Sequence, residues 1–139
     1  MNAKMICTGI LALGASFGAA AQESLSAGCI NELAFEPRLA IIADKVDVVR
    51  AVPDDRAPER LATPQEGAAL ALWAEMRQAC FEYGAAHRRA SSKPQEAAFL
   101  RSVFVFQQRL VADLQGGRVT YAEFSKRRLE LVEAAGQEI

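Results

Sequence analysis

The chain has 139 residues, with 16 Lys and Arg against 17 Asp and Glu, one His and three Cys. This length allows one ordinary domain and is too short for two. A formal net charge of -1 argues against a basic nucleic-acid-binding protein. A hydrophobic content of 51% argues against disorder over the whole chain.

The first 21 residues have the pattern of a secretory signal peptide. Lys4 supplies a positive charge, an apolar stretch follows, and Ala19, Ala20 and Ala21 provide the small residues that signal peptidase needs. We expect cleavage after Ala21, which leaves residues 22–139 as a single helical domain. A membrane anchor is the alternative, but a spanning helix needs about 20 apolar residues and this stretch is shorter. We therefore expect a periplasmic protein, or alternatively a secreted one, without a transmembrane anchor in the mature chain.

The cysteine count changes once the signal peptide is removed. Cys7 is lost, and Cys29 and Cys80 remain as an even number in an oxidising compartment. We expect them to form one structural disulfide, with two unpaired thiols as the alternative. Catalysis by Cys80 with His87 is not expected, because seven residues of helix separate them by about 10.5 Å along the axis.

The segment from Cys29 to Val49 has a mixed pattern. Pro37 can begin a short helix over residues 38–46, with Leu39, Ile42 and Val46 on one side. Residues 50–62 contain two prolines and adjacent acidic residues, which predict an irregular connection.

A long helix is predicted from Pro64 to Arg89. Thr63 and Glu66 have the spacing of a capping box, with proline at the first helical position. Gly84 is a point at which this helix can end or bend. Its apolar face consists of Ala69, Trp73, Met76, Cys80 and Tyr83.

Two further helices follow. Ser92 is a plausible cap for the helix Pro94–Gln115, which Gly116 and Gly117 end. Thr120 begins a third helix, which carries several residues on one face. Those residues are Phe124, Arg128, Leu131 and Ala135, with Tyr121 nearby. Because the connections are short, the sequence predicts an all-α fold, a small antiparallel helical bundle built on a long helical hairpin.

Residues 110–128 carry a resemblance to a known motif. The order is Leu110, Leu114, Gly116, Val119, Thr120, Glu123, Phe124 and then Arg127 or Arg128. This order resembles the short C-terminal helical hairpin called SHOCT, and the same ending resembles small exported proteobacterial helical proteins of unknown function. Tyr121 and Ala122 depart from the acidic residues common in SHOCT. The resemblance implies an interaction or oligomerisation module and carries over no catalytic residue.

Candidate chemistry is sparse. We identify no catalytic, cofactor-binding or metal-binding residue, and Asp54, Asp55 and Glu59 are interpreted as solvated surface. Two basic clusters form a possible docking patch for an anionic partner, with ordinary solvated helix surface as the alternative. The patch residues are Arg88, Arg89, Lys126, Arg127 and Arg128.

These features favour a noncatalytic role. The helix Pro94–Gln115 is apolar over more than one face, so it is either central in the bundle or in contact with a partner. We expect an interaction or structural protein that can bind an unidentified protein or form homo-oligomers. The alternative is a periplasmic inhibitor of a peptidoglycan-acting envelope enzyme, which would insert residues 50–62 into its target.

Overall fold

The computed structural model describes residues 24–53 and 55–136, and the expected signal peptide lies outside them. The described residues form five α-helices, two short 3-10 helices and no strand, which confirms the all-α fold. The helices are α1 (Ser24–Glu32), α2 (Pro64–Tyr83), α3 (Ala85–Ser91), α4 (Pro94–Gln115) and α5 (Tyr121–Ala135), and the 3-10 helices are η1 (Leu33–Phe35) and η2 (Pro37–Leu39).

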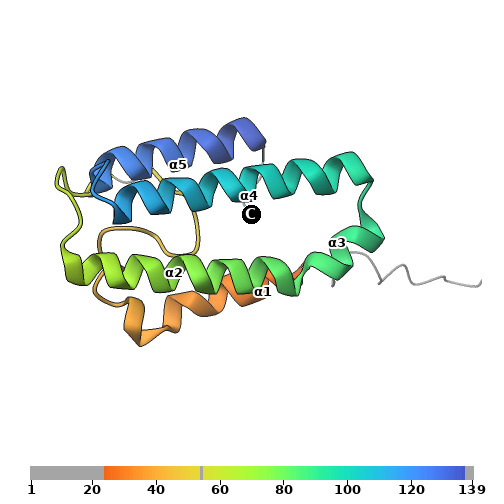
Figure 1. Ribbon diagram of the computed structural model, residues 1–139, viewed down its shortest axis with the longest axis horizontal. Coiled ribbons are helices and arrows are strands. Elements are labelled where there is room, and N and C mark those ends of the chain that lie inside the picture. The colour runs from red at the N-terminus through yellow and green to blue at the C-terminus, as the bar shows by residue number, and fades with distance from the viewer. Residues whose placement is uncertain (1–23, 54, 137–139) are drawn as a thin grey trace, which may run out of the picture.

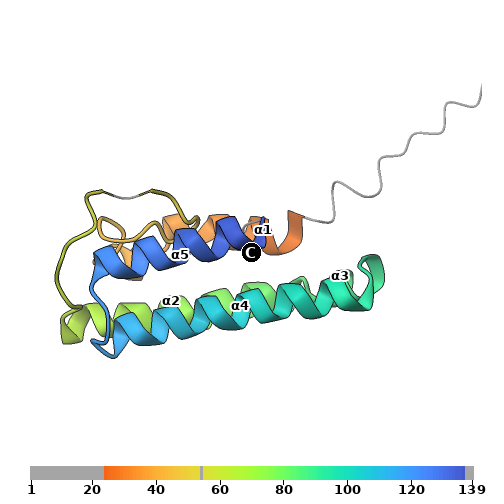
Figure 2. The ribbon, with the colours of Figure 1, turned by 90° about the horizontal axis from the view of Figure 1, so that it is seen from above.

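The long hairpin consists of α2 and α4, which lie side by side (Figure 1). Gln108 Nε2 donates a hydrogen bond of 2.9 Å to the Ala74 carbonyl, and Phe81 stacks on Phe104 with ring centroids 4.1 Å apart. Residue numbers rise along α2 from Ala74 to Phe81, while those of their partners on α4 fall from Gln108 to Phe104. The two helices are therefore antiparallel. Figure 2 shows α1 and α5 on the same side of this hairpin.

Two threonines cap α2 and α5. The Glu66 amide donates to Thr63 Oγ1 at 3.2 Å and the Thr63 amide donates to Glu66 Oε2 at 2.8 Å, which completes the predicted capping box. At the start of α5, the Glu123 amide donates to Thr120 Oγ1 at 3.2 Å. Gly117 has a φ of +67°, the left-handed conformation that glycine adopts readily after a helix end.

The helix predicted from Pro64 to Arg89 is divided at Gly84, where α2 ends and α3 begins. The expected role of Ser92 as the cap of α4 is wrong. The residue before α4 is Lys93, whose side chain makes no capping bond, and Pro94 occupies the first turn. Proline begins a helix well without a side-chain cap because its missing N–H removes one of the unpaired donors there.

The first described segment, α1, has no counterpart in the prediction. A helix of nine residues is too short to be stable by itself, so its stability depends on what it packs against. Ile30 and Leu33 are 8% and 7% exposed, and the expected disulfide joins Cys29 to Cys80 of α2, with a Cα–Cα distance of 5.4 Å. Tertiary packing and the disulfide therefore hold α1 in place.

The helix predicted over residues 38–46 is wrong as a regular element. Only η2 is helical there, and turns follow it to Lys45. The apolar spacing was nevertheless informative, because Leu39, Ile42 and Val46 are 1%, 0% and 2% exposed. Consecutive turns repeat about every three residues, so they bring these side chains to one side as a helix would.

The connection at residues 50–62 contains no regular helix in its described part, as predicted. Its second half lies against the beginning of α5. The Tyr121 and Ala122 amides donate to the carbonyls of Arg60 and Pro58, each at 3.1 Å. The connection thus satisfies two amides at the start of α5 that have no partner within the helix.

Trp73 lies at the centre of the core, with no exposed surface. Its ring contacts Phe124 of α5 edge-on, with centroids 6.1 Å apart. Its Nε1 donates to the Val48 carbonyl at 2.9 Å. One side chain of α2 therefore links both α5 and the segment around Val48 to the hairpin.

Candidate functional site

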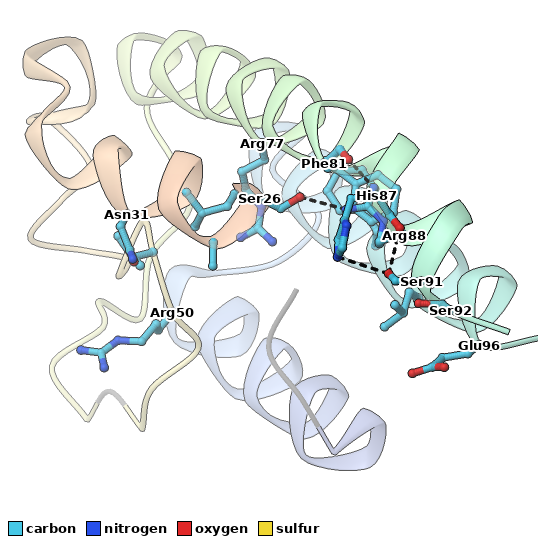
Figure 3. Close-up of a pocket in the computed structure, with 16 residues that line it drawn as sticks. Ser26, Asn31, Arg50, Arg77, Phe81, His87, Arg88, Ser91, Ser92 and Glu96 are labelled. Atoms are coloured by element: carbon cyan, nitrogen blue, oxygen red, sulfur yellow. Dashed lines mark hydrogen bonds between the residues drawn. The ribbon is translucent and has the colours of Figure 1, made fainter. Parts of the chain in front are cut away.

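The candidate site is a pocket of about 460 Å³ at the end of the bundle where α2 meets α3. Its walls come from α1, the 49–50 segment, the end of α2, α3 and the first half of α4 (Figure 3). The lining residues are Ser26, Ala27, Ile30, Asn31, Val49, Arg50, Arg77, Phe81, Gly84, His87, Arg88, Ser91, Ser92, Glu96, Leu100 and Phe104.

The absence of a side chain at Gly84 brings α1 close to this pocket. A Cβ atom built on Gly84 would lie 1.9 Å from Ser26 Oγ, well inside van der Waals contact. Gly84 is itself buried between the two helices α2 and α3. Gly84 follows the last residue of α2, and glycine is the one residue type that lets α1 approach this point so closely.

Arg88 is the best-defined polar group of the pocket. Its Nη1 donates to Ser26 Oγ at 2.9 Å, and its Nη2 donates to the Phe81 carbonyl. The guanidinium lies 3.8 Å from the centroid of the Phe81 ring, a cation–π distance. Burial lowers the pKa of Arg88, since it removes water that would stabilise the charge.

His87 and Ser91 lie together on α3. Ser91 Oγ is 3.2 Å from His87 Nε2, and it donates to the His87 carbonyl one turn back at 2.8 Å. This carbonyl bond is the ordinary one that a helical serine makes with the preceding turn. No carboxylate of the described residues bonds to the imidazole, so the pair lacks the orienting third group of a catalytic triad.

Two buried arginines flank Trp73, and sequence analysis missed their role. The guanidinium carbons of Arg77 and Arg128 lie 5.4 Å and 5.3 Å from the ring of Trp73. Arg77 Nη2 donates to Gln107 Oε1, and Arg128 Nη1 donates to the Asp47 carbonyl. Arg77 also lines the pocket. Arg128 holds the segment around Asp47 against the core.

The five residues of the predicted docking patch have different surroundings. Arg89 is exposed on α3, and Arg88 is partly buried in the pocket. Lys126 and Arg127 are exposed on α5, where Lys126 Nζ lies 4.0 Å from a Glu130 carboxylate oxygen and Arg127 is paired with Glu123. Arg128 is only 3% exposed, so its charge is not available at the surface.

Other candidate groups add no chemistry. No group of three or more His, Cys, Asp or Glu side chains with metal-site geometry occurs among the described residues. Asp54 lies outside them, while Asp55 and Glu59 are exposed. Of the helices that the structure describes, none has the length and apolar character required to cross a bilayer.

Comparison with known proteins gives no relative from which a role could be transferred. The chain matches no family model, no curated protein and no solved structure.

Proposed function

We propose that this chain is an exported, noncatalytic protein that acts by binding another protein through α4. The observation that carries the proposal is a pair of exposed aromatic side chains. Phe99 and Phe106 are 47% and 52% exposed, and they lie two helical turns apart on one face of α4. Exposed aromatic side chains that share one face are typical of protein interfaces.

The neighbouring side of α4 already has its partners. Val103, Phe104 and Val111 are at most 5% exposed in the bundle. The central position of α4 therefore accounts for part of its broad apolar surface, but it leaves the two phenylalanines uncovered. The resemblance of residues 110–128 to the SHOCT hairpin supports an interaction role for the adjoining segment, which begins in the last part of α4.

Export to the periplasm is the second part of the proposal. The Cys29–Cys80 disulfide supports it, because such bonds persist in oxidising compartments and are rare in the reducing cytosol. Secretion out of the cell remains the alternative location. Mass spectrometry of the native protein tests this part. Export with cleavage predicts an N-terminus at Gln22 and a mass lower by the two hydrogen atoms that are lost when one disulfide forms.

We propose a second copy of this chain as the partner. In an antiparallel two-fold pair of α4 helices centred between Ser102 and Val103, Phe99 of one copy faces Phe106 of the other. The two rings thus form the same contact twice, which is the self-complementary arrangement that a two-fold dimer needs.

Light scattering after size exclusion, at several concentrations, tests the dimer. We expect the double variant Phe99→Ser/Phe106→Ser to shift the equilibrium toward monomer. Val105→Ser is the matched control, since Val105 is 40% exposed on another face of the same helix. The proposal fails if the unaltered protein is strictly monomeric and a photo-crosslinker at position 99 captures no protein in envelope extracts.

The inhibitor hypothesis has one supporting observation. The connection exposes Asp55, Arg56 and Leu61, while Ala57 is 7% exposed and anchors it. A protruding segment with fixed ends suits insertion into an enzyme cleft. The variant Asp55→Ala/Arg56→Ala keeps the anchor and would reduce inhibition of peptidoglycan lysis. A wild-type protein without effect on lytic enzymes would exclude this hypothesis.

A further inference from the structure

We propose that the pocket between α1, α3 and α4 binds a small amphipathic carboxylate, an acid group carried on an apolar chain. The acid group would bind to Arg88 and the chain would lie along the apolar wall that includes Ile30, Leu100 and Phe104. This site lies apart from the phenylalanine face of α4 and does not depend on the dimer.

The size and walls of the pocket suit such a ligand. Its volume of about 460 Å³ lies within the range of about 300–1,000 Å³ that is typical of small-molecule sites. Ile30, Leu100 and Phe104 give it apolar walls from two helices that are distant in sequence. Phe81 and Phe104 also belong to the lining, and their rings stack on each other with centroids 4.1 Å apart, which fixes this part of the wall.

The charged side chains of the lining favour the binding of an anion. The lining contains Arg77 and Arg88 and one acidic residue, Glu96, so basic side chains outnumber acidic ones there. Figure 3 shows Arg77 and Arg88 reaching in from the α2 and α3 side, with Glu96 at the far edge. Arg50 also belongs to the lining, but its guanidinium points away from the other labelled side chains in this view, so we do not count it.

Arg88 has donors available for a carboxylate. A guanidinium has five N–H donors, and the bonds to Ser26 and to the Phe81 carbonyl use two of them. Both acceptors are neutral. The nearby Glu82 carboxylate attracts the charge of Arg88, while Arg89 and Arg101 repel it. A partly buried cation whose hydrogen-bond acceptors are neutral gains charge-assisted bonds from an incoming carboxylate.

Titration calorimetry on the purified, oxidised protein tests the charge requirement, with decanoate as the probe. We expect saturable binding of decanoate, and binding weaker by about ten- to a hundred-fold for decan-1-ol, which keeps the chain but lacks the charge. Arg88→Gln should weaken decanoate binding by a similar factor, and Arg89→Gln, on the exposed side of α3, should leave it unchanged. Circular dichroism checks that each variant remains helical.

A second pair of variants tests the location without changing any charge. Ala27→Trp places a large side chain at the α1 wall and should abolish binding, whereas Ala79→Trp, on an exposed position of α2 outside the lining, should not. Equal affinity for decanoate and decan-1-ol would overturn the proposal, as would unchanged binding in Arg88→Gln or Ala27→Trp.

Discussion

Replacing Glu66 by glutamine tests how one carboxylate holds the end of the bundle together. Glu66 is 4% exposed, and its two oxygens accept bonds of 2.7 and 2.8 Å from the Arg60 guanidinium. The pKa of Glu66 is lowered from 4.5 to about 2, chiefly by the bond from Arg60; burial opposes this shift and the Thr63 amide adds to it. Glutamine keeps the shape of the side chain and an oxygen that can accept the hydrogen bond from the Thr63 amide, but it lacks the negative charge.

The expected loss of stability follows from this pKa. A fall from 4.5 to about 2 corresponds to about 3 kcal/mol, at about 1.4 kcal/mol for each unit. The Arg60 side chain is 44% exposed, so solvent screens part of the attraction and we expect a loss of about 2 kcal/mol at neutral pH. Because the folded pKa is the lower one, this stabilisation is complete above about pH 4.5 and is lost as the pH falls toward 2.

Urea unfolding, followed by circular dichroism across this pH range, measures the effect. The free-energy gap between wild type and Glu66→Gln should be constant near neutral pH and should close in acid. Glu36→Gln is the matched control, since Glu36 also has a pKa near 2 through Arg38, but that arginine is 63% exposed and only two residues away. A gap for Glu66→Gln that is absent at neutral pH, or that persists unchanged in acid, would refute the reasoning.

Three further predictions concern the covalent and backbone constraints. Replacing Cys29 and Cys80 by serine opens a loop with a sequence separation of 51, so we expect thermal and urea unfolding to show a loss of about 4 kcal/mol; a loss below about 1 kcal/mol would contradict this. Gly84→Ala should lower the melting temperature, because its Cβ would overlap Ser26 Oγ. Gly67→Ala should raise it by the equivalent of about 0.5–1 kcal/mol, since the nearest atom to its Cβ would be 3.8 Å away and alanine is the better helix former. The same direction of change in both glycine variants would refute the packing argument.

The helix boundaries were predictable wherever local chemistry determines them. Proline at the first position of α2 and α4, and glycine after α4, act through their own backbone geometry, so they need no tertiary context. The disulfide was predictable for a different reason, since only two cysteines remain once residues 1–21, the expected signal peptide, are set aside. The helix α1 was not, because nine residues have little helical stability before they pack.

The candidate pocket could not be predicted, because its walls come from segments that only the fold brings together. Ser26 and Arg88 are 62 residues apart, yet their side chains are hydrogen-bonded. The burial of Arg128 had a visible signal, since it shares the apolar face of its helix with Phe124. A charged residue on an apolar face usually reaches a partner at its polar end, and here the partner is the carbonyl of Asp47.

The disulfide has a consequence for proteolysis. It spans the whole connection between α1 and α2, including the exposed residues Asp55, Arg56 and Leu61. A protease that cuts once in this stretch leaves two pieces that are still covalently joined. The nicked molecule would migrate as one band on a nonreducing gel and separate only after a thiol is added, so a cleaved form could pass unnoticed while both halves of the bundle remain assembled.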